Sequence, residues 1–537
     1  MTTHMDAKAL SREPDWYAAG AWRAEPLWLS FVKAAEGPGC NATVRDGRDL
    51  VTLPELLAHA RRIAGGLAAA GVEKGGAVIV QSRNALDAFA ALLACFSQGF
   101  VAIPLPPMFS AAQVCAVAES AAAQALVALE EGGLATIRHV LANVPLVRAA
   151  FTVETTEAGI DPRVRAWTDC LVSEPMQADP PSPEADAIVL YSSGSTGAPK
   201  GVVHSGNSLR FATEALTAFH KVVPEDRVLV GLEFGFVGGT VLGALLAFLA
   251  GASTVLMRKW DVNECLATIE RERITYTLLM PTHCYDVLIR DDLDRFDLKS
   301  LSRAILAGAT PEQRRKAAGL FCGVPFPMYG MSESIAHATC AVGDLDHGIF
   351  TTDGRTLPGT EMRVLDDQGR PTAPGEIGNV FLRGPNRLRR YQSRPDLTAR
   401  VIDAEGWFAT GDRGRVDAHG FLNFVARASE MIRRGGIMIQ PAEIEIALGT
   451  HAAIAELAVI GIPDDRLGER ACACARLKPG QALDIEAMRV HLQAAGLPRY
   501  QWPEHLLIFT EFPRTPSLKV RRADLAAEAR ERLLKTN

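Results

Sequence analysis

Short apolar runs alternate with longer segments rich in Ala and Leu between residues 50 and 330. The short runs have the length and β-branched content of buried strands, as in 77–80, 100–103, 275–279 and 303–306. The longer segments predict helices over 56–70, 86–96, 262–271 and 311–320. The last helix opens on a proline, which a first helical turn tolerates. The alternation of strands and helices predicts a doubly wound α/β structure.

The pattern changes twice towards the C-terminus. Around residues 350–425, Gly and Pro separate short strands, which predicts a β-rich subdomain. After Arg427 a small α+β unit is expected, beginning with a helix over 441–448 that has proline and acids in its first turn. Its predicted strands are 456–460 and 471–477. We therefore expect a large N-terminal domain over residues 1–429 and a small C-terminal domain over 430–537.

One segment, residues 234–257, carries no charge and is long enough to cross a bilayer. It also contains five glycines and ends in a run, 253–257, that has the composition of a strand. A buried helix followed by a buried strand explains both features, so we expect no membrane span.

Composition narrows the class of protein. The net charge is −6 over 537 residues and no block of basic residues occurs, which disfavours nucleic acid as a partner. The ten cysteines form no Cys-x-x-Cys pair, and Cys472 and Cys474 lie on one face of a predicted strand, so we expect them in the core. The first 20 residues lack the apolar segment of a secretory signal, and a cytoplasmic location is expected.

Residues 191–201 are rich in hydroxyls and glycines and lie between two predicted strands. The glycines permit close backbone approach to a ligand, and the hydroxyl groups and one cation can bind phosphate oxygens. The predicted phosphate-binding residues are Ser192, Ser193, Gly194, Ser195, Thr196, Gly197 and Lys200. A P-loop is a competing interpretation, but it requires Ser or Thr directly after Gly-Lys, and here Gly201 follows Lys200. A flexible surface turn is the other alternative.

Further motifs follow downstream in a fixed order: Tyr-Gly-Met-Ser-Glu at 329–333, Thr-Gly-Asp at 410–412, Arg427, Gly-Gly at 435–436, and Lys519. In this order and spacing the chain resembles, over nearly its whole length, the adenylate-forming superfamily. That superfamily contains acyl-CoA synthetases, non-ribosomal peptide adenylation domains and luciferases. The resemblance implies an AMP-forming ligase that uses ATP and Mg²⁺ to make an acyl-adenylate and then transfers the acyl group to coenzyme A.

The resemblance also implies roles for single residues. Glu333 matches the magnesium ligand, Ser332 the hydroxyl that meets the α-phosphate, and Tyr329 the ring that packs on adenine. Gly308, Ala309 and Thr310 stand where the family lines the adenine pocket, at the end of a predicted strand. Asp412 is similar to the aspartate that binds both ribose hydroxyls, and Arg427 to the arginine that meets the same sugar. Without the resemblance, Glu333 would be a solvated glutamate and Thr-Gly-Asp a turn.

The C-terminal domain of the family is a lid that carries the catalytic lysine, matched here by Lys519, and turns at a hinge matched by Glu430. The resemblance places Gly435 and Gly436 in the thiol channel. The chain departs from the family pattern at Ala426, where glycine is usual, and at Glu430, where aspartate is usual. Leu518 replaces the glycine that normally precedes the lysine, so a solvated surface Lys519 stays an alternative.

The family comparison further implies an acyl pocket lined by Phe236, Val237, Gly238, Gly239 and His283, with the backbone of Gly330 and Met331 as neighbours. We expect the glycines to leave room for a cyclic aromatic or alicyclic acid, and no Asp or Glu of this stretch to bind an ammonium group. Two other functions stay open: a stand-alone ligase that loads a carrier-protein thiol, and a catalytically impaired binding protein. A homodimeric assembly also stays open. No metal-ligand cluster or Ser-His-Asp arrangement indicates a competing chemistry.

Overall fold

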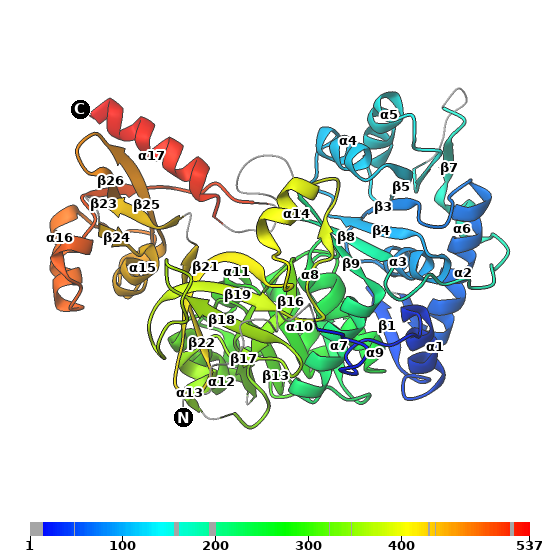
Figure 1. Cartoon of the computed structure of the whole chain (residues 1–537), viewed down its shortest axis with the longest axis horizontal. Coiled ribbons are helices and arrows are strands. Elements are labelled where there is room, and N and C mark those ends of the chain that lie inside the picture. Colours follow the sequence, from blue (N-terminus) through cyan, green and yellow to red (C-terminus); the bar gives the residue numbers. More distant parts are fainter. Residues whose placement is uncertain are drawn as a thin grey trace, which may run out of the picture.

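The computed structural model describes residues 14–47, 49–154, 161–192, 200–321, 323–344, 346–427, 430–434, 437–515 and 520–536. Figure 1 shows a large α/β body, with a smaller unit formed by the last part of the chain beside it. This arrangement confirms the predicted fold class.

The first sheet of the large body has eight strands in the order β20-β9-β8-β4-β3-β5-β6-β7. Their bounds are β3 (Ala77–Gln81), β4 (Val101–Leu105), β5 (Ala123–Ala128), β6 (Ala149–Thr152), β7 (Val164–Ala166), β8 (Asp186–Ser192), β9 (Lys200–Ser205) and β20 (Arg390–Tyr391). All neighbours pair parallel except at β9, which is antiparallel to both β8 and β20. The helices of this part are α2 (Leu53–Ala69), α3 (Leu86–Gln98), α4 (Ala111–Ser120), α5 (Gly133–Asn143) and α6 (Trp167–Leu171).

The second sheet has seven strands in the order β14-β13-β12-β10-β11-β1-β2. Their bounds are β1 (Thr43–Asp46), β2 (Asp49–Thr52), β10 (Arg227–Val230), β11 (Ser253–Leu256), β12 (Tyr276–Leu279), β13 (Arg303–Leu306) and β14 (Val324–Phe326). All pairs are parallel except β1 with β2. Helices in this part are α1 (Leu27–Glu36), α7 (Gly206–His220), α10 (Val262–Glu272), α11 (Pro281–Leu288), the short 3₁₀ helix η2 (Leu293–Arg295) and α12 (Pro311–Phe321).

The uncharged segment forms α8 (Val237–Gly239), the π-helix η1 (Thr240–Leu245), α9 (Leu246–Leu249) and then β11. Its helical residues from Val241 to Phe248 are almost entirely buried. A side chain at Gly243 would approach Val230 to 3.1 Å, so the helix packs closely on β10. The buried helix and buried strand expected here are confirmed. No helix in the described part of the chain is long and apolar enough to span a membrane.

One asparagine joins the carboxyl ends of the two sheets. Asn84 follows β3, and its side-chain amide donates to the carbonyl oxygens of Val230, Leu232 and Met257, at 3.3, 2.8 and 3.1 Å. Its Oδ1 accepts from the Phe234 amide at 2.9 Å. Because Val230 ends β10 and Met257 follows β11, the strand ends of both sheets meet here, where open α/β sheets bind their ligands.

The predicted β-rich subdomain is confirmed as two antiparallel sheets. One has the order β18-β19-β21-β22 and the other β15-β16-β17. Their strands are β15 (Met328–Met331), β16 (Ser334–Thr339), β17 (Arg355–Thr356), β18 (Glu361–Leu365), β19 (Gly378–Arg383), β21 (Phe408–Val416) and β22 (Leu422–Arg427). The short helices α13 (Asp346–Thr351) and α14 (Pro395–Val401) lie between them in sequence.

The C-terminal domain is the expected α+β unit. Its sheet has the order β24-β23-β26-β25, and β27 pairs parallel with β26. Its elements are β23 (Ile432–Arg434), β24 (Ile437–Ile439), α15 (Pro441–Gly449), β25 (Ile454–Asp464), β26 (Gly468–Leu477), α16 (Ile485–Ala494), η4 (Arg499–Gln501), β27 (His505–Ile508) and α17 (Arg522–Thr536). Cys472 and Cys474 are fully buried in one apolar cluster, as predicted, with their Sγ atoms 4.0 Å apart.

Candidate active site

The predicted phosphate-binding loop joins β8 and β9 as expected. Residues 193–199, which include Ser193, Gly194, Ser195, Thr196 and Gly197, lie outside the described residues. Ser192 ends β8, and Lys200 opens β9 and is half-buried. A side chain at Gly201 would come within 2.9 Å of both Gln392 and Tyr191, so packing requires a glycine directly after the lysine.

A buried histidine connects β9 to the Tyr-Gly-Met-Ser-Glu motif. Nε2 of His204 lies 2.6 Å from the Ser332 carbonyl oxygen, and since a carbonyl only accepts, Nε2 carries the proton. Burial lowers the pKa of His204 to about 4, which keeps the ring neutral at neutral pH. The turn that holds Ser332 and Glu333 is therefore fixed against the strand that begins with Lys200.

Glu333 is held from both its backbone and its side chain. Its carbonyl oxygen accepts from the Leu388 amide at 2.7 Å, and its Oε1 accepts from the Tyr391 hydroxyl at 2.9 Å. Burial and the Glu333 carboxylate raise the pKa of Tyr391, so the phenol stays protonated and acts as the donor. Tyr391 lies opposite Val202 in the β9–β20 ladder. Two neighbouring strands thus bring Glu333 and Lys200 into one region.

Asp412, Tyr329 and Arg427 form a second connected group. Asp412 and Arg427 are directly opposite in the β21–β22 ladder. The Tyr329 hydroxyl donates to Asp412 Oδ2 at 2.6 Å, and the Arg427 Nε lies 2.9 Å from Asp412 Oδ1. The Arg427 side chain is 41% exposed, whereas that of Asp412 is 2% exposed. The strand register therefore places a half-exposed cation over a buried carboxylate.

One oxygen of Asp412 is left without a hydrogen bond. Although the Arg427 guanidinium is close, its N–H does not point at Oδ1, and Oδ1 has no hydrogen-bond partner within the described part of the chain. Burial raises the pKa of Asp412, while the Arg427 charge and the Tyr329 hydrogen bond lower it. A buried carboxylate oxygen without a donor is costly. This site can accept a hydrogen bond from a hydroxyl group of a ligand.

The segment Gly308–Thr310 follows β13, as predicted. Gly308 is exposed and has a φ of +64°, a conformation that favours glycine. Thr310 forms the start of α12 through reciprocal hydrogen bonds with Gln313, at 2.8 and 3.2 Å. Ala309 is buried and its carbonyl oxygen accepts from Arg314 at 2.7 Å. Thr310 thus has a structural role as a helix cap, and both Gly308 and Thr310 are exposed.

The predicted acyl-pocket residues follow two neighbouring strands of the second sheet, β10 and β12. Phe236 and Val237 follow β10 and are half-buried. His283 lies in the first turn of α11, after β12, and stacks on Trp260 with ring centroids 3.9 Å apart. Its Nδ1 is buried without a hydrogen-bond partner in the described structure, and burial lowers the pKa of His283 to about 4. A neutral imidazole with one unused nitrogen therefore lies at these strand ends.

The glycines of this stretch do not leave room for a substrate, and the reasoning that they do was wrong. A side chain at Gly238 would come within 2.6 Å of Leu232, and one at Gly239 would overlap the carbonyl oxygens of Leu232 and Glu233. The chain itself fills the space. Glu233 was also overlooked: its Oε2 is buried without a hydrogen-bond partner within the described residues, and burial raises its pKa.

The C-terminal domain contributes one predicted residue that the structure describes. Glu430 is exposed and its Oε2 lies 3.4 Å from the Arg522 Nε. Gly435, Gly436 and Lys519 lie outside the described residues.

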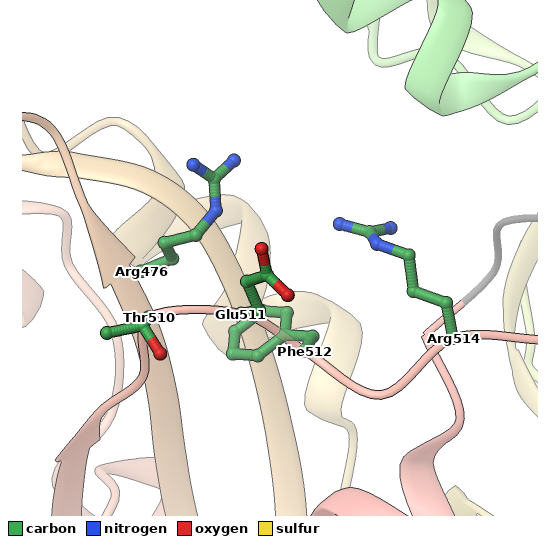
Figure 2. A pocket seen from close by; sticks show the side chains of 5 residues that line it. All are labelled: Arg476, Thr510, Glu511, Phe512 and Arg514. Carbon is green, nitrogen blue, oxygen red and sulfur yellow. The ribbon is translucent and has the colours of Figure 1, made fainter.

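A cavity of about 500 Å³ opens in the same domain, lined by Arg476, Thr510, Glu511, Phe512 and Arg514 (Figure 2). In Figure 2 the Glu511 carboxylate lies between the two guanidinium groups, and both arginines pair with Glu456, at 3.3 and 2.7 Å. The lining therefore contains both positive and negative side chains. None of the predicted site residues lines this cavity.

Sequence reasoning missed His204 and Tyr391, which fix the Glu333 turn. Tyr391 lies in a two-residue strand that local pattern does not mark, and His204 pairs with a residue more than a hundred positions away. No group of three or more His, Cys, Asp or Glu side chains that could hold a metal occurs in the portion of the chain that the structure describes.

Comparison with known proteins identifies the family. Residues 31–392 match the AMP-binding enzyme family, and residues 443–519 match the AMP-binding enzyme C-terminal domain. Indoleacetate–CoA ligase of Aromatoleum aromaticum (strain DSM 19018 / LMG 30748 / EbN1) is 31% identical over 506 residues, with 93% of this chain and 96% of the relative covered. Medium-chain fatty-acid–CoA ligase of Escherichia coli (strain K12) is 29% identical, with 96% and 92% covered.

Among solved structures, the anthranilate CoA ligase AuaEII in complex with anthranoyl-AMP superposes with a TM-score of 0.87 at 22% identity, over 95% of this chain and 98% of that one. At this identity the likeness concerns the fold. Because the first family match spans more than half of the sequence, the chain belongs to the AMP-binding enzymes.

Proposed function

We propose that this AMP-binding enzyme is an ATP- and Mg²⁺-dependent acid–thiol ligase that makes an acyl-adenylate and transfers the acyl group to coenzyme A. The observation that carries the proposal is the buried Asp412 oxygen that has no hydrogen-bond donor among the described residues, close to Tyr329, Arg427 and Glu333. A nucleotide ribose supplies the missing donor, because its hydroxyl groups can both donate to a carboxylate.

The residues present fit a nucleotide. Asp412 would accept from the ribose, and Arg427, half-exposed beside it, would contact the same sugar. The buried ring of Tyr329 would pack on adenine, and its hydroxyl keeps Asp412 in place. The exposed backbone at Gly308, together with Ala309 and Thr310, would border the base.

The triphosphate would lie between the 192–197 loop, Lys200 and the Glu333 turn. Glu333 would be a ligand of Mg²⁺, which favours carboxylate and phosphate oxygens and neutralises phosphate charge when bound. Its fixed position fits this role, since Tyr391 occupies one oxygen and leaves the carboxylate oriented. The Ser332 hydroxyl and the backbone of Gly330 and Met331 would approach the α-phosphate and the acyl group.

In the first step the substrate carboxylate attacks the α-phosphorus, an oxygen–phosphorus bond forms, and pyrophosphate leaves. The step needs cations and aligned donors rather than proton transfer. Lys519 would supply a cation at the α-phosphate. In the second step a thiolate attacks the acyl carbonyl, a thioester forms and AMP leaves.

We also propose that the chain divides into residues 1–429 and 430–537, that the second part moves about Glu430, and that Gly435 and Gly436 border the thiol channel. The thiol is assigned to coenzyme A because the two relatives described above are named CoA ligases. A carrier-protein thiol is the second candidate, and the two are separated by the acceptor in the experiment below.

The acid is proposed to be cyclic, aromatic or alicyclic. This assignment rests on Phe236 and on the flat Trp260–His283 stack rather than on the glycines. The neutral His283 offers no negative charge to an ammonium group. Each additional buried methylene contributes about 0.8 kcal/mol, which favours such acids over acetate.

The test is a panel of acids assayed for pyrophosphate release with ATP and Mg²⁺. The panel spans acetate, straight-chain, aromatic, alicyclic and α-amino acids, and products are identified by mass spectrometry. Each active acid is then offered coenzyme A or a phosphopantetheinylated carrier protein. If no acid of the panel causes release of pyrophosphate, the result indicates a binding protein instead of an enzyme. Preferred use of acetate or an amino acid would contradict the pocket assignment.

A further inference from the structure

The strand that carries Tyr391 is short and lies at the edge of the first sheet. β20 has two residues and pairs with β9. The backbone hydrogen bonds that join the two strands run from the Arg389 amide to the Val203 carbonyl oxygen, at 2.9 Å, and from the Gln392 amide to the Gly201 carbonyl oxygen, at 2.7 Å. Because so short a ladder is only marginally stable, a fixed position of β20 requires further contacts.

The chain directly after β20 is held by two helices. The Tyr391 amide donates to the Thr398 hydroxyl on α14 at 3.0 Å. The Ser393 hydroxyl donates to the carbonyl oxygen of Ser120, the last residue of α4, at 2.7 Å. These contacts fix the carboxyl end of the strand and leave its first residue to be fixed by other groups.

The beginning of β20 is held by one carboxylate on another strand. Asp186 opens β8, which lies beyond β9 in the sheet. The Arg390 guanidinium donates to both carboxylate oxygens of Asp186, from Nη1 to Oδ1 at 2.8 Å and from Nη2 to Oδ2. Nη1 of Arg389 donates to Oδ1 at 2.6 Å. A bidentate pair adds geometric specificity to the attraction, so Asp186 restrains the orientation of the edge strand as well as its distance from β8.

Arg390 and Tyr391 are neighbours in an extended strand, so their side chains point to opposite faces of the sheet. On one face Arg390 pairs with Asp186, and on the other the Tyr391 hydroxyl donates to Glu333 Oε1 at 2.9 Å. A rotation or slip of β20 that separates Arg390 from Asp186 therefore also displaces the Tyr391 hydroxyl. The two contacts are connected through a single peptide unit.

We propose that Asp186 is a positioning residue for adenylation. It holds β20 through Arg389 and Arg390, and β20 in turn orients the Glu333 carboxylate through the Tyr391 hydroxyl. The hydrogen bonds described for the Asp186 side chain go to the two arginines and to none of the proposed site residues, so its effect on the reaction passes through the strand. The inference rests on the proposed function, in which Glu333 is a ligand of Mg²⁺.

A second ion pair near the same edge of the sheet provides a matched control. Lys74 Nζ lies 2.8 Å from Asp179 Oδ2. Lys74 lines a cavity of about 510 Å³ together with Asp186, Arg389 and Arg390, but neither residue of the Lys74–Asp179 pair lies in β20. Asp179→Asn therefore removes a carboxylate near the same cavity without removing a partner of β20.

The experiment compares Asp186→Asn with Asp179→Asn in the full-length chain. Asp186→Asn keeps the size of the side chain and removes its charge. In the ligand-free protein, hydrogen exchange of residues 388–392 is expected to rise about two- to tenfold. Pyrophosphate exchange with the preferred acid should fall by a similar factor at every Mg²⁺ concentration, with the KM for ATP unchanged. Asp179→Asn should change neither quantity.

Two further variants test the partners of the carboxylate. Arg390→Gln removes the bidentate pair from the other side and should reproduce the effects of Asp186→Asn. Asp186→Glu keeps the charge and should restore part of the loss. If Asp186→Asn and Arg390→Gln both leave hydrogen exchange of 388–392 unchanged, the proposal is overturned.

Tyr391→Phe separates positioning from a general loss of stability. If Asp186 acts through the Tyr391 hydroxyl, adding Asp186→Asn to Tyr391→Phe causes no further loss of pyrophosphate exchange. Losses that multiply in the double variant would contradict the proposal. The proposed function has its own readout, because wild-type enzyme that forms no acyl-adenylate with any acid refutes that function. Hydrogen exchange, which needs no substrate, then decides whether Asp186 holds β20.

Discussion

At the residue scale, the site depends on a few polar groups that are held by neighbours distant in sequence. Tyr329 and Asp412 are joined by a 2.6 Å hydrogen bond, and Tyr391 and Glu333 by one of 2.9 Å. In each pair a buried tyrosine hydroxyl, with a raised pKa, fixes one oxygen of a carboxylate. In Asp412 the other oxygen, Oδ1, has no hydrogen-bond partner among the described residues. The two tyrosines therefore orient carboxylates without neutralising them.

This arrangement predicts the effect of Asp412→Asn. The change keeps the size and the Tyr329 contact but replaces one carboxylate oxygen by an amide, so the ribose loses a charged acceptor. We expect the KM for ATP to rise about 10- to 100-fold, the equivalent of one charge-assisted hydrogen bond of 1.5–3 kcal/mol, with no dependence on Mg²⁺. Tyr329→Phe is the control: it keeps the ring and the free oxygen, and should cost less. Equal losses in the two variants would contradict the ribose assignment.

Glu333→Gln tests the metal ligand. The amide keeps the size of the side chain and can still accept from Tyr391, but it loses the charge that Mg²⁺ favours. Pyrophosphate exchange should fall at fixed Mg²⁺ and recover in part as the metal is raised. Tyr391→Phe, which keeps the charge and removes the donor, should lower the rate without any recovery. If Asp412→Asn and Glu333→Gln respond alike to Mg²⁺, their roles are not separate.

At the element scale, the strands and helices quoted from the sequence were found within a few residues of their predicted bounds. Strand β13 matches 303–306, and helix α12 covers 311–321 against a prediction of 311–320. Local periodicity marks such elements because their buried faces repeat along the chain. The grouping of the strands into two sheets was not predicted, since β1 pairs with β11 about two hundred residues later.

In the site, too, local features were predicted from the sequence and tertiary contacts were not. The motif residues Tyr329, Glu333, Asp412 and Arg427 were predicted and are brought together by the ladders of three sheets. The residues that hold them, His204 and Tyr391, were not predicted because their contacts depend on tertiary structure. The glycines of 238–239 were misinterpreted for a related reason. The sequence alone does not distinguish a glycine that leaves space for a ligand from a glycine that avoids a clash with the chain itself.

The short helix α8, which follows β10, gives an element-scale prediction. A side chain at Gly239 would overlap two carbonyl oxygens, whereas one at Gly319, in helix α12, would meet no atom within 4 Å. Gly239→Ala should lower the free energy of unfolding by about 1–3 kcal/mol through overpacking. Gly319→Ala should raise it by about 0.5–1 kcal/mol, since alanine favours the helix. Thermal midpoints of the two variants measure both effects, and a stable Gly239→Ala protein would disprove the close packing.

At the scale of the whole molecule, buried histidines make stability depend on pH. Burial lowers the pKa of His204, His283 and His337 to about 4, below the unfolded value of about 6.5. Between these values the unfolded chain binds more protons than the folded one, so stability falls as the pH falls from about 6.5 to about 4. Each histidine contributes a slope of about 1.4 kcal/mol per pH unit.

The thermal midpoint should therefore decrease steeply between pH 6.5 and pH 5 and change little between pH 7 and pH 8. His337→Gln removes one of these groups, and its slope should be shallower than that of the wild type. Among the described hydrogen bonds, the His337 ring pairs with Ser334 and the Glu361 carbonyl oxygen and with none of the proposed site residues. A midpoint that is flat from pH 7 to pH 5 would show that the rings are not buried as described.

The proposed role of the C-terminal domain in the first step leads to a prediction for Lys519. If the C-terminal domain brings this lysine to the α-phosphate only for the first step, Lys519→Ala should nearly abolish acyl-adenylate formation. One positioned cation beside developing phosphoryl charge contributes about 3–4 kcal/mol, so the rate should fall several hundredfold. Thioester formation from supplied acyl-adenylate and coenzyme A should be preserved, because that step needs the thiol and not the lysine.

Leu518→Gly tests the departure from the family pattern that precedes this lysine. If the family glycine has a positive φ, leucine at this position costs about 1–2 kcal/mol, and restoring glycine should speed the first step without affecting the second. Rapid-quench measurement of acyl-adenylate, with thioester formation measured separately, distinguishes the two steps. If Leu518→Gly has no effect and Lys519→Ala slows adenylation only mildly, the first step depends on a different cation, and Lys200 at the start of β9 is the next candidate to substitute.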